Sequence, residues 1–150
     1  MAHNTPGERL SVLEGNPATM NLPAYLASLI VAEEFPTGAA AELSPVIARL
    51  FHTLRPYGGV AVLAIAPKDR PAFQEAVVAA ALHGAKVRES GRYVLLAREG
   101  ALPGAGNWTH EHADAANTRV SKDKLVKAPL GILWFGGVTH DGILPRHGHG

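Results

Sequence analysis

Apolar residues in the first hundred positions follow two patterns that alternate along the chain. Residues 29–31 and 60–65 are continuous apolar runs, which are typical of strands buried on both faces of a parallel sheet. Residues 42–54 instead place apolar side chains at helical spacing, namely Leu43, Val46, Ile47, Leu50, Phe51 and Leu54. The pattern therefore predicts a strand, an amphipathic helix with one buried face, and a second strand.

Proline and glycine mark the ends of these elements. The first predicted helix ends at residues 55–59, Arg-Pro-Tyr-Gly-Gly, because proline cannot continue the hydrogen-bond ladder and glycine adopts positive φ at little cost. A second helix is predicted after the second strand, with Pro71 inside its first turn. Its apolar side chains are Phe73, Val77, Ala80 and Ala81.

The last predicted element before residue 98 is a hairpin. Residues 85–89 and 92–97 flank the turn Ser90-Gly91 and have alternating faces, which predicts two antiparallel strands. Strands that alternate with helices in this order favour an α/β fold around a mostly parallel sheet. The hairpin is expected to close that sheet.

A helix ending in Leu-Arg-Pro-Tyr-Gly-Gly, an apolar strand, a helix and a terminal hairpin together resemble the C-terminal half of a class I S-adenosylmethionine-dependent methyltransferase. The resemblance covers about residues 10–98 and implies a partial Rossmann-like sheet. The usual turn in that family is Leu-Lys/Arg-Pro-Gly-Gly, so Tyr57 lengthens it by one residue.

Residues 12–16, Val-Leu-Glu-Gly-Asn, resemble the third strand of that family, expected over residues 10–14, and the loop after it. The resemblance implies cofactor-binding positions at Gly15 and Asn16. The family commonly has an acidic residue there that contacts the adenine. Asn16 can instead accept a hydrogen bond from the adenine amino group through its carbonyl oxygen.

Two further cofactor-binding features of the family would lie before Met1. These are the glycine-rich loop after the first strand and the acidic residue that holds the ribose. We therefore expect a fragment of a longer protein that does not itself use S-adenosylmethionine. The parent is expected to be a methyltransferase; alternatively, it is a non-catalytic binding or scaffold protein with a degenerate domain. No catalytic residue or methyl acceptor is indicated.

Residues 108–150 resemble the beginning of a PQQ-type β-propeller in large bacterial multidomain proteins. The resemblance rests on Trp-Thr-His, Ala-Asn and an apolar strand at residues 130–135. Residues 99–107 lack periodicity and favour a linker. The predicted organisation is thus a partial methyltransferase-like domain at 1–98, a linker, and an incomplete all-β propeller. The resemblance implies PQQ as a ligand of a complete propeller, but one strand cannot form a blade, so no cofactor is expected here.

Composition excludes some function classes. A net charge of +1 over 150 residues, without a basic run interleaved with aromatic residues, argues against nucleic-acid binding. The longest apolar run is too short to span a membrane, and the first residues lack the pattern of a signal peptide. The compartment stays open, because the parent could be exported through an upstream signal and the absence of cysteine does not fix a location.

Some of the histidines have a spacing that occurs in metal sites, but the motif is incomplete. His110, His112 and Asp114 have the His-x-His-x-Asp spacing of metallo-β-lactamase-like hydrolases, in which alternate residues of an extended segment share a face. Ala115 replaces the histidine that continues the motif, and His147-Gly148-His149 suits a flexible loop. We therefore expect no metal.

Other polar and aromatic residues have structural interpretations beside functional ones. Glu33 and Glu34 follow the first strand at the ligand-binding edge of such sheets, although paired carboxylates are usually solvated. His52 can interact with the C-terminal dipole of its helix. Trp108 and Trp134 are interpreted as packing anchors between propeller strands.

The sheet is expected to have an open edge. In the family's strand order the first and second strands lie between the third and the fourth. Residues 29–31 correspond to the fourth strand, so without the first two strands they become an uncovered apolar edge. Open apolar edges pair with available strands. The expected partners are therefore the remainder of the parent protein and, through this edge, further copies of the chain.

Overall fold

The computed structural model describes residues 12–16 and 19–129 of the chain. The chain divides into two units, Met1–Pro103 and Gly104–Gly150, which are considered separately below. The helices and strands of the described residues all lie in the first unit. In chain order they are β1 (Leu29–Ala32), α1 (Ala40–Thr53), β2 (Gly59–Ala64), the short 3₁₀ helix η1 (Pro67–Asp69), α2 (Arg70–Ala79), β3 (Ala85–Ser90) and β4 (Tyr93–Arg98).

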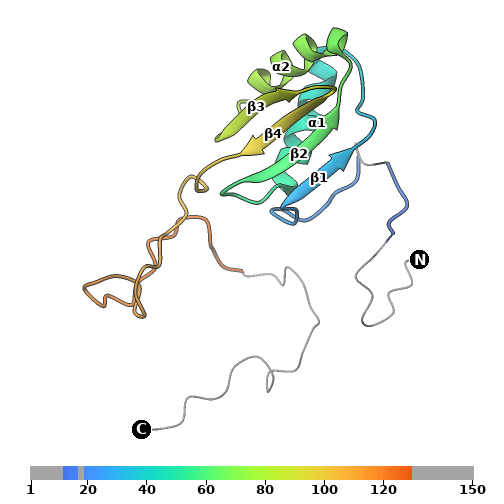
Figure 1. The fold of residues 1–150 in the computed structure, drawn as a ribbon. Helices are drawn as coiled ribbons and strands as arrows, with labels where there is room; N and C mark the ends of the chain where they lie inside the picture. The colour runs from blue at the N-terminus through green and yellow to red at the C-terminus, as the bar shows by residue number, and fades with distance from the viewer. Residues whose placement is uncertain (1–11, 17–18, 130–150) are drawn as a thin grey trace. The chain divides into compact units, whose positions relative to one another are not determined.

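The four strands form one mixed sheet in the order β1-β2-β4-β3 (Figure 1). β1 is parallel to β2, and β4 is antiparallel to both of its neighbours. β1, β2 and β3 thus run in one direction, and β4 enters between β2 and β3 in the other. The α/β fold and the closing hairpin are confirmed; the sheet is mixed rather than mostly parallel.

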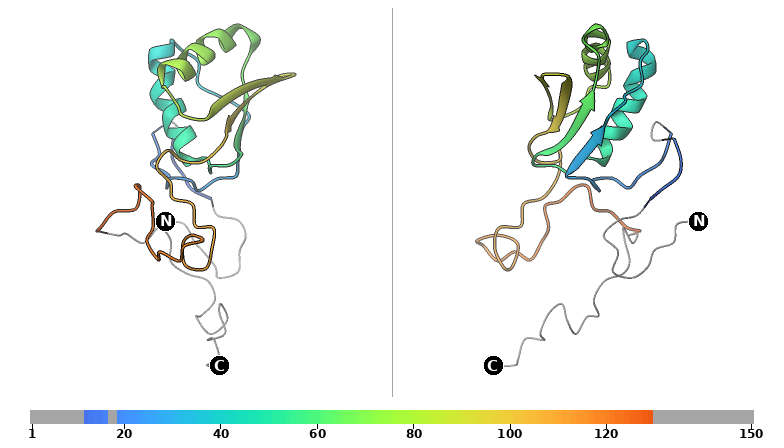
Figure 2. Two further views of the ribbon diagram at one scale, coloured as in Figure 1. Left: turned by 90° about the vertical axis from the view of Figure 1, so that its left-hand side faces the viewer. Right: turned by 45° about the vertical axis from the view of Figure 1, so that its right-hand side comes forward.

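Both helices pack on the same face of the sheet (Figures 1 and 2). β2 alternates buried and half-buried residues, and Ala61 and Leu63 point toward the helices. The core between the layers contains Leu43, Ile47, Phe51, Leu54, Ala61, Leu63, Ile65, Phe73, Ala76, Val77, Val94 and Leu96. Burial of this layer supplies the main driving force for the fold.

The turn between α1 and β2 has little room for side chains. A Cβ atom at Gly59 would lie 2.5 Å from the carbonyl oxygen of Arg55. Tyr57 has a φ of 60°, and its N–H donates to the carbonyl of Gly100 at 3.0 Å. The glycine thus permits a close backbone approach. The added Tyr57 occupies the left-handed position that a non-glycine residue rarely takes.

Arg98 joins the end of β4 to the end of α1. Its Nη1 donates to the carbonyl oxygens of Phe51 and Leu54, both at 3.1 Å. The guanidinium also lies 4.8 Å from the ring centroid of Phe51 and 4.9 Å from that of Tyr25. A cation at the C-terminus of a helix satisfies otherwise unpaired carbonyls and interacts favourably with the helix dipole. His52, for which the sequence predicts a dipole interaction, lies in the same last turn.

Three sequence predictions about this unit are wrong in detail. Residues 12–14 form no strand, and Val12 is 76% exposed, because no neighbouring strand among the described residues pairs with them. The second helix ends at Ala79, and Ala81 has a φ of 48°. The hairpin turn is Gly91-Arg92, since Gly91 provides the positive φ, 58°, at the first turn position.

The described part of the second unit contains no strand. Residues 104–129 are loops with a single bridge between His110 and Ala113. The strand expected at residues 130–135 lies outside the described residues.

We predict that Arg98→Met lowers the free energy of unfolding by roughly 2–3 kcal/mol, because two carbonyl groups lose a charged donor. Arg92→Met is a matched control, since Arg92 is exposed and its guanidinium contacts the neighbouring Tyr93 rather than helix carbonyls. Urea unfolding followed by circular dichroism measures both variants. Equal, small effects in the two variants would contradict the assigned role of Arg98.

Candidate functional site

A pocket of about 610 Å³ lies beside β1 in the first unit. Its lining residues are Asn16, Ile30, Val31, Ala32, Glu34, Phe35, Pro36, Val46 and Leu50. Its size lies within the range of about 300–1,000 Å³ that is usual for ligand sites. The lining is mostly apolar, and the Asn16 amide and the Glu34 carboxylate are its polar side chains.

The walls of this pocket are fixed by the core. Val46 and Leu50 are four residues apart on α1 and therefore lie one above the other on the same side of the helix. Ile30 and Leu50 also pack against the buried core cluster. Phe35 makes an edge contact with the buried Phe73, with 5.6 Å between ring centroids and an interplanar angle of 81°. The apolar wall is thus preformed by the packing of α1 and α2.

Asn16 and Glu34, both candidates from the sequence, line this same pocket. The residues after β1 follow the carboxyl end of a parallel strand, where α/β sheets bind ligands. Gly15 and Glu33 are not lining residues. Gly15 precedes Asn16, and a Cβ atom there would lie 2.6 Å from Cε of Met20. One residue of each candidate pair from the sequence, Asn16 of Gly15-Asn16 and Glu34 of Glu33-Glu34, therefore lines the pocket.

Sequence reasoning missed the apolar wall. Phe35 and Pro36 lie in the loop after β1, where no periodicity marks them. Val46 and Leu50 were interpreted only as helix core, although their half-buried positions are what exposes them to the pocket. The available signal was the helical spacing of Val46 and Leu50, which lie four residues apart and therefore on one side of α1.

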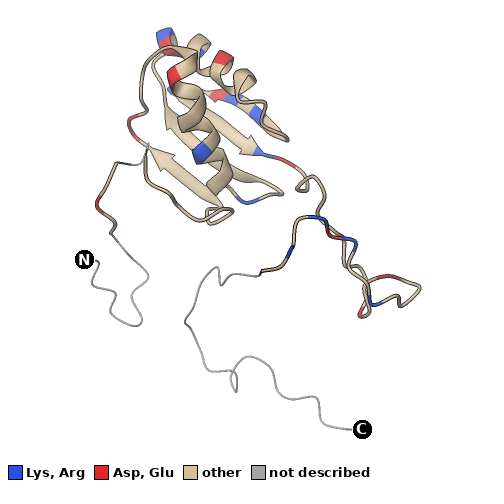
Figure 3. Cartoon of the chain, turned by 180° about the vertical axis from the view of Figure 1, so that it is seen from behind, with Lys and Arg blue, Asp and Glu red and all other residues tan. Residues whose placement is uncertain are grey.

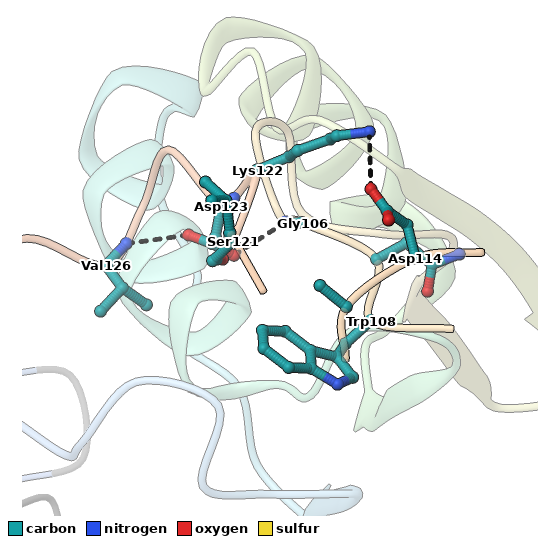
Figure 4. Close-up of a pocket in the computed structure, with 10 residues that line it drawn as sticks. Gly106, Trp108, Asp114, Ser121, Lys122, Asp123 and Val126 are labelled. Carbon is teal, nitrogen blue, oxygen red and sulfur yellow. Dashed lines mark hydrogen bonds and ion pairs between the residues drawn. The ribbon is translucent and has the colours of Figure 1, made fainter. Parts of the chain in front are cut away.

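The second unit contains a smaller pocket of about 170 Å³ (Figure 4). It is held together by two aspartates. The carboxylate of Asp123 accepts hydrogen bonds from the N–H groups of Gly106 at 2.8 Å, Leu125 at 2.7 Å and Val126 at 2.9 Å. Gly106 lies in the segment predicted to be a linker, and this contact joins it to the later loop.

Asp114 organises the other side of this loop. Its carboxylate accepts hydrogen bonds from the N–H groups of Ala116 and Thr118 and from the Thr118 hydroxyl at 2.9 Å. Lys122 Nζ lies 3.4 Å from the same carboxylate. The hydrogen bonds from Thr118, and to a lesser extent Lys122, hold the pKa of Asp114 below its ordinary value of 3.8. Asp114 therefore acts here as a hydrogen-bond acceptor within the loop.

The His-x-His-x-Asp spacing does not gather metal ligands. His110 Nδ1 lies 2.8 Å from the hydroxyl of Thr109. No group of three or more His, Cys, Asp and Glu side chains that could hold a metal occurs in the described ranges, and His147 and His149 lie outside them.

Trp108 lines the small pocket but is 57% exposed, so the described residues give it no packing partner of the kind predicted (Figure 4). Trp134 is not among those residues. A pocket of about 170 Å³ is smaller than the usual range of ligand sites. The pocket beside β1 is therefore the stronger candidate site.

Comparison of the chain with protein-family models, with curated proteins and with solved structures found no significant match. Among the helices of the described ranges, none has the length and apolar character needed to cross a membrane.

We predict that acid loosens the loop around Asp123. Hydrogen bonds from Gly106, Val126 and Leu125 lower the pKa of this carboxyl below 3.8. The charged carboxylate therefore favours the ordered loop above its unfolded pKa, and this contribution is lost as the pH falls through the lowered pKa. The backbone amide signals of Gly106, Leu125 and Val126 in NMR spectra should shift together toward random-coil values as the pH falls below the ordinary carboxyl range.

Asp123→Asn provides the control for this acid transition. Its side chain keeps one acceptor oxygen but has no group that titrates in this range, so the three amide signals should be insensitive to acid. Identical titration curves for the variant and the unsubstituted chain would contradict the role of the Asp123 carboxylate.

Proposed function

We propose that about residues 10–98 are the C-terminal part of a class I S-adenosylmethionine-dependent methyltransferase-like domain, and that residues 108–150 begin a PQQ-type β-propeller of the same larger protein. In this proposal the methyl group comes from the sulfonium of the cofactor, and the protein supplies binding and orientation. The chain by itself has no methyltransferase activity. PQQ is a ligand only of a complete propeller.

The arrangement of the elements supports the first part of this proposal. The order β1-α1-β2-α2-β3-β4 is the one on which the resemblance rests, with the long turn at Tyr57 between α1 and β2. The terminal hairpin closes the sheet through β4, which is antiparallel to β2. Fold alone does not determine activity, so the site must carry the functional argument.

The observation that carries the proposal is the presence of Asn16 at the pocket beside β1. Sequence resemblance alone had assigned Asn16 to the adenine. Its carbonyl oxygen can accept a hydrogen bond from an adenine amino group, and the apolar side chains of Ile30 and Phe35 provide surface for a flat ring. The Glu34 carboxylate lines the same pocket and can accept a hydrogen bond from a bound molecule.

The outer edge of β1 supports the proposal that this sheet is part of a larger one. The N–H of Val60 donates to the carbonyl of Ser28, and the amide groups of a strand alternate between its two sides. The N–H and C=O groups of Leu29 and Val31 therefore face away from β2. No strand of the described residues pairs with them, which is the situation expected if a further strand belongs there.

We predict that the chain does not bind S-adenosylmethionine with a dissociation constant in the low micromolar range. One hydrogen bond from Asn16 contributes about 1 kcal/mol, which is far below the binding energy required. Calorimetric titration of the chain measures this directly. Low-micromolar binding would mean that the cofactor positions have been assigned wrongly.

In this proposal, cofactor binding requires a longer polypeptide that supplies the other cofactor-binding features of the family. In a polypeptide extended upstream of Met1, an intact glycine-rich loop would support the enzyme, and a degenerate loop would support the binding or scaffold alternative. For the enzyme, Asn16→Ala should weaken cofactor binding about fivefold, the equivalent of one hydrogen bond. Asn21→Ala is the control, because Asn21 is exposed and is not a lining residue of the pocket.

We also predict that the chain self-associates through the outer edge of β1. Val31→Pro removes an outward N–H without removing a hydrogen bond to β2, so it should shift the chain toward monomer in size-exclusion chromatography. Val31→Thr keeps both the N–H and the branched side chain and should behave like the unsubstituted chain. Hydrogen exchange should be slowest in β2. A concentration-independent monomer would contradict this prediction.

A further inference from the structure

The face of the sheet opposite the helices has an ordered pattern of side chains. Strand register places Leu29, Val60, Ala97 and Lys86 in one row across the sheet, and Val31, Val62, Leu95 and Arg88 in the next. A third row contains Ala64, Tyr93 and Ser90. Apolar side chains thus occupy β1, β2 and β4, and the polar side chains of this face begin at β3.

No helix among the described residues covers this face, since both pack on the other side (Figures 1 and 2). Leu29 and Val31 are each 61% exposed. Parallel sheets are almost always covered on both faces, and β1 and β2 form a parallel pair. An apolar face that spans three strands is therefore a surface built for contact with another element.

Charge is distributed unevenly around this face. β1 and β2 contain no charged residue (Figure 3). The strand register places Lys86 and Arg88 of β3 on this side of the sheet. Arg92 follows in the hairpin turn, with its guanidinium 4.8 Å from the ring centroid of Tyr93. One anion, Glu99, pairs with Arg88 at 3.0 Å. Three cations and one anion leave a net positive rim along one side of the apolar face.

The width of the apolar region matches one helix. Neighbouring strands lie about 4.8 Å apart, so the axes of β1, β2 and β4 span about 10 Å. This is close to the diameter of a helix with its side chains, about 10–12 Å. The six residues of β2 extend over about 20 Å, the length of a helix of roughly 13 residues. A second sheet would be wider and would bury the uncompensated Lys86, which is costly.

We propose that this face binds an amphipathic helix that carries acidic residues along one flank of its apolar stripe. The stripe lies over β1, β2 and β4, and the acidic flank lies beside Lys86, Arg88 and Arg92. The two α-helices of the described residues do not meet that description, because α1 carries Glu42 and α2 carries Glu75 as the single acid of each. The occupant is therefore a different segment from those two helices, and the inference does not depend on the proposed methyltransferase activity.

Two synthetic helices test the proposal. Both are fluorescently labelled 14-residue peptides, stapled as helices, with leucines at positions i, i+3, i+4 and i+7 of one face. The first has glutamates along one flank of that face, and the second has lysines at the same positions. Fluorescence anisotropy with the whole chain at low salt should show at least tenfold tighter binding of the acidic peptide.

Charge reversal on the protein provides the decisive comparison. Lys86→Glu combined with Arg92→Glu should reverse the preference between the peptides, and both positions are exposed, so the fold is expected to survive. Lys68→Glu combined with Arg55→Glu makes the same change in net charge at exposed positions outside this face and should leave the preference intact.

Other outcomes overturn the proposal. Equal binding of the two peptides, binding of neither, or a preference that the control variant also reverses would each exclude a helix with an acidic flank. A lipid membrane can also present an apolar and anionic surface. Sedimentation with vesicles of phosphatidylcholine and phosphatidylserine therefore measures whether the chain binds lipid. Binding to the vesicles without binding to the acidic peptide would assign the face to a lipid surface instead.

Discussion

The first unit depends on one apolar layer, in which β2 and β4 pack against α1 and α2. Ile47 from α1, Leu63 from β2, Phe73 from α2 and Leu96 from β4 are each at most 1% exposed, and they come from all four elements. Every other feature of the unit is arranged around this contact. The pocket beside β1 is lined by residues of both α1 and β1, and Arg98 holds the two layers together where α1 ends.

The sequence predicted those parts of the fold that a local pattern specifies. The helical spacing of Leu43, Ile47 and Phe51 and the apolar run around Leu63 are properties of single segments, so the corresponding elements were found with errors of one or two residues. The strand expected at residues 10–14 was predicted from a resemblance alone. A strand requires a neighbour, and the described residues 12–14 have none. The hairpin turn shifted by one residue because Gly91, rather than Ser90, accepts positive φ.

Prediction of the candidate site was less complete, for a related reason. Asn16 and Glu34 were selected by residue type and by position after an expected strand, and they share one pocket. Their apolar surroundings depend on the angle at which α1 crosses the sheet, which no local pattern records. In the second unit, the hydrogen bonds of Asp114 and Asp123 replace regular secondary structure. Short loops closed by aspartates have no periodicity and could not be distinguished from a linker.

The two edges of the sheet differ in a way that limits how copies can join. β3 carries Lys86, Arg88 and Glu89 within six residues, and charged side chains of this kind discourage the addition of a strand. β1 has no charged residue. A chain with two receptive edges can grow into a fibre, because each addition leaves a new edge exposed. With one receptive edge, pairing of two copies through β1 leaves only β3 edges outward, and strand addition stops at a closed pair.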